Sequence, residues 1–309
     1  MASNSYPRPD YNGGEVTELL YERLVGPQAV DGVIGHPGDP AAVFADGSGT
    51  RTVKVRADKR ALLRGFAYES GSSDIPIELP ANTSGTTRVD LIVLRLTRST
   101  WRIQEAYVQG TPGAGAPNGT YNTGDTGVYD LPLAEVTVAH NATTLAASTV
   151  TPVAWTVGVD GQIRCTSTTM PPHEVGRRVW QTDTARGLIS SGSSWLVYAE
   201  ETGESTMSLA SGFTASNNHI KRRNGWVLCE LTVRRTAAII PANTNVQVAT
   251  VPAGYRPPFL IQTNGVVPSG NQVVAFTIST AGAVVINSGP TGINANRSAI
   301  MATFSWPVA

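Results

Sequence analysis

Short runs in which apolar and polar residues alternate make up most of this chain, and turn-forming residues separate them. Residues 52–56 alternate strictly, which predicts a strand with one buried and one solvated face. Residues 88–96 are almost continuously apolar, which favours a strand covered on both faces, and residues 101–103 begin its expected hairpin partner. Apolar residues recur at helical spacing only near residues 16–24. The pattern therefore predicts an all-β protein with one short helix.

The same pattern divides the chain into three regions. Residues 1–153 form a first β-rich domain, which a polar excursion at 110–127 interrupts as an exposed loop that is long enough for a contact role. Residues 154–205 hold only short apolar pieces between turns and are expected to form a β-hairpin neck. Residues 206–309 alternate again in several runs, which predicts a C-terminal β-sandwich or jelly-roll.

The neck contains a small unit at residues 176–195 that cannot bury a core of its own. Two short apolar pieces, at 179–180 and 188–189, flank a polar run, and a second aromatic residue, Trp195, follows a Gly-Ser turn. Such a unit needs a partner, and an identical chain is the simplest one. We therefore expect self-association, although no hydrophobic heptad seam is present.

Composition narrows the class of protein further. The formal net charge is zero and only 15% of the 309 residues are charged, so the basic footprint of a nucleic-acid-binding protein is missing. The first residues lack the pattern of a secretory signal, and no apolar run is long enough to span a bilayer. We expect synthesis in the cytoplasm without a signal peptide and no membrane insertion. Cys165 and Cys229 lie in different regions and are expected to be buried thiols rather than a disulfide.

Several segments resemble known proteins when they are taken in order. The segments VKVRADKRALLRGFAYESG, TTRVDLIVLRL, GTPGAGAP and YDLPLAEVTV, all within residues 31–150, look like the N-terminal domain of baseplate and tail-fibre proteins. Those proteins come from phages, prophages and contractile injection systems of actinobacteria. The TDT…G…W segment of the neck and the turn VPAGYRP resemble the segments that precede and form the C-terminal tip domains of phage tail fibres.

The resemblance implies a function and an assembly. Residues 1–153 would attach to other baseplate or tail proteins, residues 154–205 would trimerise, and residues 206–309 would bind a bacterial cell-surface glycan or wall polymer. The protein would then be a homotrimer located in the tail or baseplate of a virion or an injection particle. The alternative is a purely structural baseplate subunit that has no contact with a host.

The residues give little support for an enzyme. Glycan-cleaving enzymes usually need two carboxylates, and Glu230 is the only acidic residue in the last hundred positions. Glu200, Glu201 and Glu204 form a charged run at a domain boundary, which is typical of a solvated linker. The histidines are scattered without metal-binding spacing, so neither a metal nor another cofactor is expected. A glycan depolymerase is the less favoured third hypothesis.

Carbohydrate recognition combines an exposed aromatic ring with polar donors and acceptors. Predicted turns of the C-terminal region offer these groups at Tyr255, Arg256, Asn264, Asn271, Asn294, Asn296 and Arg297. The basic run Lys221, Arg222 and Arg223, interpreted as a loop, is either solvated or a contact for an anionic wall polymer. Tyr255 has a structural alternative as well, which is packing against a neighbouring subunit.

Overall fold

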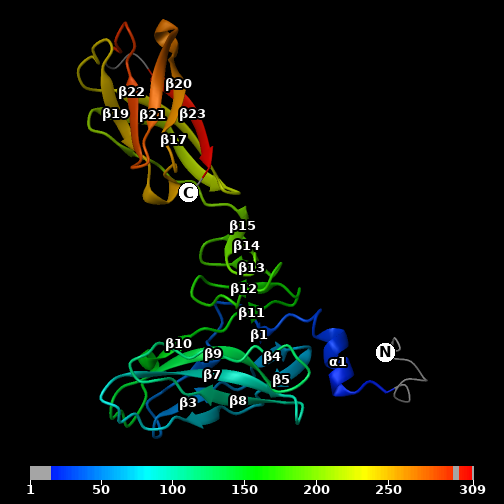
Figure 1. Ribbon diagram of the computed structural model, residues 1–309. Coiled ribbons are helices and arrows are strands. Elements are labelled where there is room, and N and C mark those ends of the chain that lie inside the picture. The colour runs from blue at the N-terminus through cyan, green and yellow to red at the C-terminus, as the bar shows by residue number, and fades with distance from the viewer. Residues whose placement is uncertain (1–14, 295–298, 308–309) are drawn as a thin grey trace. The chain divides into compact units, whose positions relative to one another are not determined.

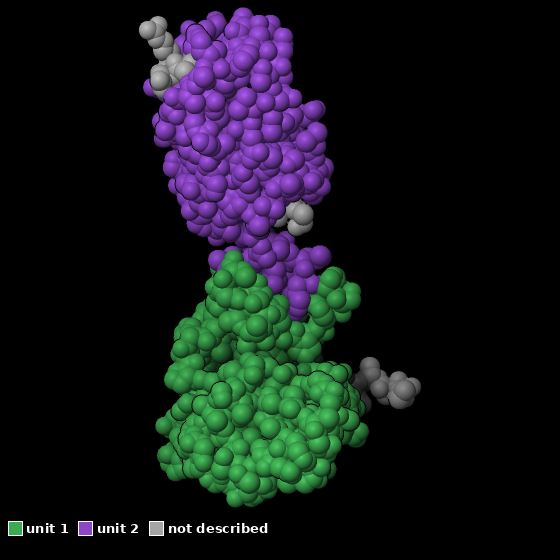
Figure 2. Space-filling model, turned by 90° about the vertical axis from the view of Figure 1, so that its left-hand side faces the viewer, with its two compact units in different colours: residues 1–184, 190–194 green, residues 185–189, 195–309 purple. Residues whose placement is uncertain are grey.

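A computed structural model describes residues 15–294 and 299–307 of the chain (Figure 1). The chain divides into two compact units, which Figure 2 colours separately. Unit 1 comprises residues 1–184 and 190–194, and unit 2 comprises residues 185–189 and 195–309. The described residues form strands and one α-helix, which confirms the predicted all-β class. The predicted boundaries of three separate regions stay predictions.

Three groups of strands make up the sheets of unit 1. The first runs in the order β13-β12-β11-β1-β4-β5, the second in the order β10-β9-β7-β8, and the third in the order β2-β3-β6. The bounds of the first group are Arg178–Gln181 (β13), Ile163–Cys165 (β12), Thr156–Val157 (β11), Gly32–Ile34 (β1), Arg60–Leu63 (β4) and Phe66–Glu69 (β5). Those of the others are Val150–Pro152 (β10), Val128–Val138 (β9), Arg88–Thr97 (β7), Arg102–Val108 (β8), Val43–Phe44 (β2), Thr52–Val55 (β3) and Ile75–Glu78 (β6).

Strand β7 lies at the centre of the second sheet, as its nearly continuous apolar sequence predicts. It pairs antiparallel with β8 on one side and with β9 on the other. The register with β9 shifts between Ile92 and Val93, next to Pro132, which has no N–H group to donate to the sheet. The antiparallel pairing of β7 with β8 confirms the predicted hairpin.

A buried carboxylate anchors the helix α1 (Glu18–Val25) of unit 1. Thr17 caps the start of the helix through its side-chain oxygen. The Glu22 side chain is buried and accepts hydrogen bonds from Arg64 Nε at 3.0 Å and from Arg98 Nε at 2.8 Å. Two guanidinium groups contributed by other segments thus hold the helix in place.

The polar loop at residues 110–127 contains no strand, as predicted, and carboxylates fix it at two points. Asp90 accepts a hydrogen bond from the Gly110 backbone at 2.9 Å, and Asp130 accepts one from the Thr120 backbone at 2.9 Å. Both carboxylates are fully buried. The loop is therefore irregular but tied to the strands on which it lies.

Unit 2 is built on one eight-stranded sheet with the order β16-β19-β22-β21-β20-β23-β18-β17. The strands of this sheet are Ser208–Leu209 (β16), Asn245–Thr250 (β19), Ala283–Asn287 (β22), Gln272–Ile278 (β21), Ile261–Val267 (β20), Ala299–Pro307 (β23), Trp226–Arg235 (β18) and Phe213–Arg223 (β17). The strands Arg186–Ser190 (β14) and Trp195–Glu200 (β15) precede this sheet in the chain.

Residues 201–209 nearly close this sheet into a barrel. Glu201 and Ser205 bridge to Arg223 and Ile220 of β17, while β16 pairs with β19 at the other end of the strand order. The predicted sandwich thus takes the form of a single barrel-like sheet, with both of its ends joined to the same short segment.

The core of unit 2 follows the alternation in its strands. Val227, Leu231 and Val233 of β18 point inward and are fully buried, as their spacing predicts. Phe276 contacts Phe304 in an edge-to-face arrangement, with ring centroids 5.2 Å apart. Apolar side chains from all the larger strands therefore meet in one cluster.

Both cysteines are buried free thiols, which confirms the prediction. Cys165 lies on β12 of unit 1 and Cys229 on β18 of unit 2. No helix in the described part of the chain has the length and apolar character needed to cross a membrane.

Candidate functional site: an exposed sheet face of unit 2

Unit 2 presents an apolar surface where strand alternation would ordinarily place polar residues. Strands β20, β23, β18 and β17 are neighbours, and their outward side chains share what we call the outer face. Four apolar side chains on it are exposed, namely Trp226 (52%), Leu228 (43%), Val266 (48%) and Met301 (39%). A group of exposed apolar side chains on one face of a sheet usually marks a contact surface.

The register of the strands sets these side chains in rows. Glu230 of β18 lies directly opposite His219 of β17 and Thr303 of β23. Leu228 lies opposite Lys221 in the next row. Because directly opposed residues have neighbouring side chains, each row brings groups from three strands together.

Two open hollows meet at Glu230 and Thr303. The larger has a volume of about 530 Å³ and also involves Glu204, His219, Lys221 and Leu228. The smaller has a volume of about 260 Å³ and also involves Asn264, Val266 and Met301. The hollows thus combine carboxylates, a basic group, an amide and apolar side chains, which is a mixture typical of ligand-binding surfaces.

Some polar side chains of the larger hollow contact polar neighbours, which hold them in place. Asn217 Nδ2 donates a hydrogen bond to Glu230 Oε1 at 3.1 Å. Glu204 Oε2 lies 3.3 Å from His219 Nδ1. Glu204 therefore contributes to the C-terminal sheet, whereas the sequence pattern predicted a solvated linker at this position.

Glu200 departs further from the linker interpretation, because it is buried. Its carboxylate contacts Arg186, and Arg222 lies 2.6 Å away. Arg222 also donates to the Gly254 carbonyl at 2.9 Å. This carboxylate is thus part of the framework of unit 2.

The basic run at residues 221–223 was expected in a loop, and that expectation is wrong. The three residues end strand β17, so successive side chains point in opposite directions. Arg222 turns toward Glu200, whereas Lys221 lines the larger hollow and Arg223 is exposed. The run therefore does not form a patch of three charges.

The predicted receptor contacts are dispersed over unit 2. Asn264 lies within strand β20 rather than in the expected turn, and it lines the smaller hollow. Asn271 occupies a turn with a φ of 52°, and Asn294 is exposed. Asn296 and Arg297 lie outside the described residues.

Tyr255 and Arg256 support the fold of unit 2. Tyr255 ends a short 3-10 turn, Ala253–Tyr255 (η3), and its carbonyl accepts a hydrogen bond from Trp306 Nε1 at 2.8 Å. Arg256 Nε donates to the Val251 carbonyl at 3.4 Å. Both side chains are half-buried, and neither lines a hollow of the outer face.

The sequence interpretation missed Trp226, Leu228, His219 and Glu204 as site residues. A signal for the first two was available, because they occupy the outward positions between the inward residues of β18. Large apolar residues at positions that should be solvated indicate a contact surface. No local signal existed for Glu204, which reaches the hollow only through the closure of the barrel.

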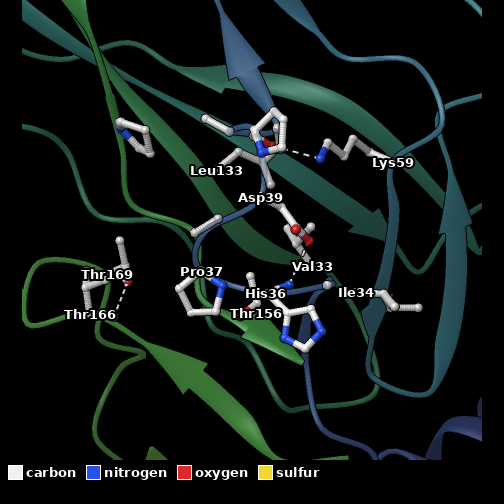
Figure 3. A pocket seen from close by; sticks show the side chains of 16 residues that line it. Val33, Ile34, His36, Pro37, Asp39, Lys59, Leu133, Thr156, Thr166 and Thr169 are labelled. Carbon is white, nitrogen blue, oxygen red and sulfur yellow. Dashed lines mark hydrogen bonds between the residues drawn. The ribbon is translucent and has the colours of Figure 1, made fainter. Parts of the chain in front are cut away.

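A further hollow of about 130 Å³ lies in unit 1 (Figure 3). Its polar groups already have partners within the protein. Asp39 accepts a hydrogen bond from the His36 backbone at 2.8 Å, and Lys59 donates to the Pro40 carbonyl at 2.8 Å. Among residues 15–294 and 299–307, no three histidine, cysteine or acidic side chains group as metal ligands. The outer face of unit 2 is therefore the stronger candidate.

The chain was compared with protein families, curated proteins and solved structures. No protein-family model matches the chain, and no curated protein matches it either. The chain is similar to the solved structure of the head domain of phage bIL170, from work on the receptor-binding domains of lactococcal phages. The identity is 21%, the match covers 35% of this chain and 98% of that chain, and the TM-score is 0.29.

Proposed function

We propose that this protein is a tail-fibre or baseplate component of a bacteriophage or of a related injection particle, and that unit 2 binds a bacterial cell-surface glycan or wall polymer. The outer face is the observation that carries this proposal. It sets the exposed Leu228 beside polar groups around an open hollow, and the exposed Trp226 lies two positions from Leu228 on the same face of β18. Sugars are bound in this way, because their C–H faces pack on apolar side chains while their hydroxyls need polar partners.

The proposed attachment to the particle rests on the first region of the chain. The segments within residues 31–150, taken in their order along the chain, resemble attachment domains of baseplate and tail-fibre proteins. We therefore assign contacts with other tail proteins to residues 1–153. The protein would be located in the tail or baseplate.

A homotrimer is the proposed assembly, and strand β15 supports self-association. Its residues Leu196 (54%), Val197 (43%) and Tyr198 (45%) are consecutive, apolar and exposed. A strand with exposed apolar side chains on both faces favours association with another chain. Three weak sites on one particle component would bind by avidity, which can increase binding roughly 10²–10⁴-fold.

A baseplate subunit without host contact is the second candidate, and the same face supports it. Val266 and Met301 of this face, and Val273 (59% exposed) opposite Val266 on the adjoining strand β21, are apolar residues that another virion protein would also cover. The two candidates differ in the partner that they predict for this surface.

Binding of the full-length, fluorescently labelled protein to intact cells of a panel of actinobacteria tests the proposal. We expect saturable binding to some strains and at least about a tenfold loss in Trp226→Ala, since an aromatic anchor in a binding surface can contribute that much. Phe259→Ala is the matched control, because Phe259 is 54% exposed and lies outside the four strands that form the outer face. Binding to purified tail particles but to no cell would support the scaffold role instead.

A further inference from the structure

We infer that the larger hollow of the outer face selects an uncharged sugar of the receptor rather than an anionic group of a wall polymer. This inference rests on the proposed receptor-binding function. It concerns the hollow that Glu204, His219, Lys221, Leu228, Glu230 and Thr303 line. The ligand class is a neutral, hydroxyl-bearing oligosaccharide.

The first reason is the position of Glu230. It lies on a strand with neighbours on both sides, and Asn217 holds one of its oxygens at 3.1 Å. A carboxylate has about four acceptor sites, so most of its acceptor capacity faces the hollow. Hydroxyl groups of a sugar are suitable donors for it, and Thr303 provides a further hydroxyl in the same row.

The second reason is the local balance of charge. Among the described residues, two carboxylates, Glu204 and Glu230, line the hollow together with one lysine, Lys221, and with His219, which lies against Glu204. A phosphate or carboxylate group that entered would be placed near both negative side chains, and like charges at such distances repel each other. The hollow therefore disfavours an anionic ligand.

The third reason is where the basic residues 221–223 lie in the structure. Arg222 forms an ion pair with Glu200, and the side chains are only 12% (Arg222) and 3% (Glu200) exposed. Arg222 is therefore not accessible to a polymer. Lys221 and Arg223 remain, and they are separated by one position along the strand. Three adjacent cationic groups, which would favour a polyanion, are not available on this surface.

The basic residues of the region retain a different role. Residues 206–309 contain seven lysines and arginines but one acidic residue. Such an excess attracts the region to an anionic cell envelope over long distances and in a salt-dependent way. Charge would thus increase the rate of encounter, while the hollow would select the sugar.

The apolar part of the face sets the length of the ligand. Trp226 and Glu230 are four residues apart on β18, which corresponds to roughly 13 Å at about 3.3 Å per residue. Leu228 lies between them on the same face. A ligand that contacts both ends is longer than one sugar ring, so the preferred ligand is an oligosaccharide with C–H faces over Leu228 and Trp226.

Competition measurements on cell binding by the full-length protein test this inference. The competitors are neutral oligosaccharides released from the wall of a bound strain and, separately, polyglycerol phosphate. We expect the neutral fraction to compete and polyglycerol phosphate to compete only at low salt. Glu230→Gln should weaken binding about tenfold or more, because a hydrogen bond to a charged acceptor is the stronger kind.

Arg234→Gln is the matched control, since it removes an exposed charge from the same strand at a position that lines neither hollow. We expect it to reduce binding at low salt and to leave competition by the neutral fraction unchanged. Glu230 is exposed, so an unchanged melting temperature should show that Glu230→Gln folds normally. If wild type binds cells, Glu230→Gln binds equally well and only polyglycerol phosphate competes, the inference is wrong while the receptor function stands. Absence of cell binding by wild type would overturn both.

Discussion

Unit 1 buries several ionised side chains, whereas unit 2 builds its core from apolar ones. Arg88 and Asp90 of unit 1 form an ion pair at 2.8 Å with side-chain exposures of 2% and 0%. Among the described residues of unit 2, Glu200 is the buried charged side chain, and it lies near the start of the unit. The two units thus reach a folded state by different means.

The difference follows from how each unit provides hydrogen-bond partners for its backbone N–H and C=O groups. Unit 1 contains long irregular segments such as residues 110–127, in which few N–H and C=O groups pair with a neighbouring strand. Buried carboxylates and guanidinium groups supply the missing partners, as Asp90 does for Gly110. In unit 2 most of the chain lies in paired strands, so the alternation of apolar residues suffices.

Removing an aromatic ring from the core of unit 2 should lower the stability of that unit alone, and we expect this to be the largest change in stability among the variants. Phe276 is fully buried, and Phe276→Ala should lower the free energy of unfolding of unit 2 by about 3–5 kcal/mol, because a cavity replaces the ring. Calorimetric melting of the full-length protein measures this change. Val273→Ala on the same strand is the control, since Val273 is exposed and its loss leaves no cavity. A fall in the transition of unit 1 as well would contradict the separation of the two cores.

Removing a buried charge should affect unit 1 alone. Asp90→Asn leaves the Arg88 guanidinium buried without a counter-charge, which should cost about 3 kcal/mol, the lower end of the usual range. The lower end applies because Arg88 still donates to the Pro80 carbonyl at 2.8 Å. Calorimetry should show the transition of unit 1 shifted down and that of unit 2 unchanged.

The exposed ion pair of Lys54 with Asp46, at 2.7 Å, provides the control for this experiment. Asp46→Asn removes a charge from the surface, where water screens the interaction, and we expect no measurable shift in melting. If both variants destabilised unit 1 equally, burial of the ion pair would not be the reason for its importance.

Acid should weaken unit 1 through Glu22. Burial raises the pKa of this carboxyl, but the hydrogen bonds and charges of Arg98 and Arg64 outweigh burial and hold the pKa below its ordinary value of 4.5. A lowered pKa in the folded state stabilises the protein above the unfolded-state pKa, and that contribution is lost as pH falls below about 4.5 and through the folded-state pKa.

The measurement is chemical unfolding of wild type and Glu22→Gln between neutral and acidic pH. Wild type should lose more stability than the variant as the pH falls, because the variant has no carboxyl to protonate at this position. Burial raises the pKa of Asp31, which gives the opposite trend, but that group is present in both proteins and cancels in the difference. Equal pH dependence in both would exclude Glu22 as the source.

The sequence predicted the regular parts of the molecule better than its polar contacts. Alternation identified β18, β21 and β23 because their inward residues are uniformly apolar. Strand β17 was missed, since of its eleven residues only Phe213 and Ile220 are buried. Its pairing depends on β18 and on residues 201–209, which no local pattern reveals.

The same limit applies to the candidate site and to the buried charges. Trp226 and Leu228 occupy outward positions that the pattern of β18 defines. The meeting of Glu204 with Glu230 joins residues that are distant in sequence and depends on the near closure of the barrel. The contact of Glu22 with Arg98 spans 76 positions, and nothing in the neighbourhood of either residue predicts it. Long-range polar pairs therefore require the structure.

The two cysteines provide the most delicate test of the comparison, because each unit contains one. Burial, with a smaller effect of a nearby carboxylate, raises the pKa of Cys165 and of Cys229 to about 12 from an ordinary 9. The thiolate, which is the reactive form, is then about a thousandfold rarer than in an exposed thiol at mildly alkaline pH. We expect both thiols to resist alkylation in the native protein and to react when their own unit opens.

Labelling with iodoacetamide, followed by peptide mass spectrometry, should therefore report each unit separately. Phe276→Ala should accelerate labelling of Cys229 about a hundredfold or more while Cys165 stays slow, and Asp90→Asn should do the reverse, because the labelling rate follows the population of the opened unit. Val273→Ala and Asp46→Asn should change neither rate. If both cysteines accelerated together in either variant, the two units would unfold as one, and their different cores would be parts of a single cooperative fold.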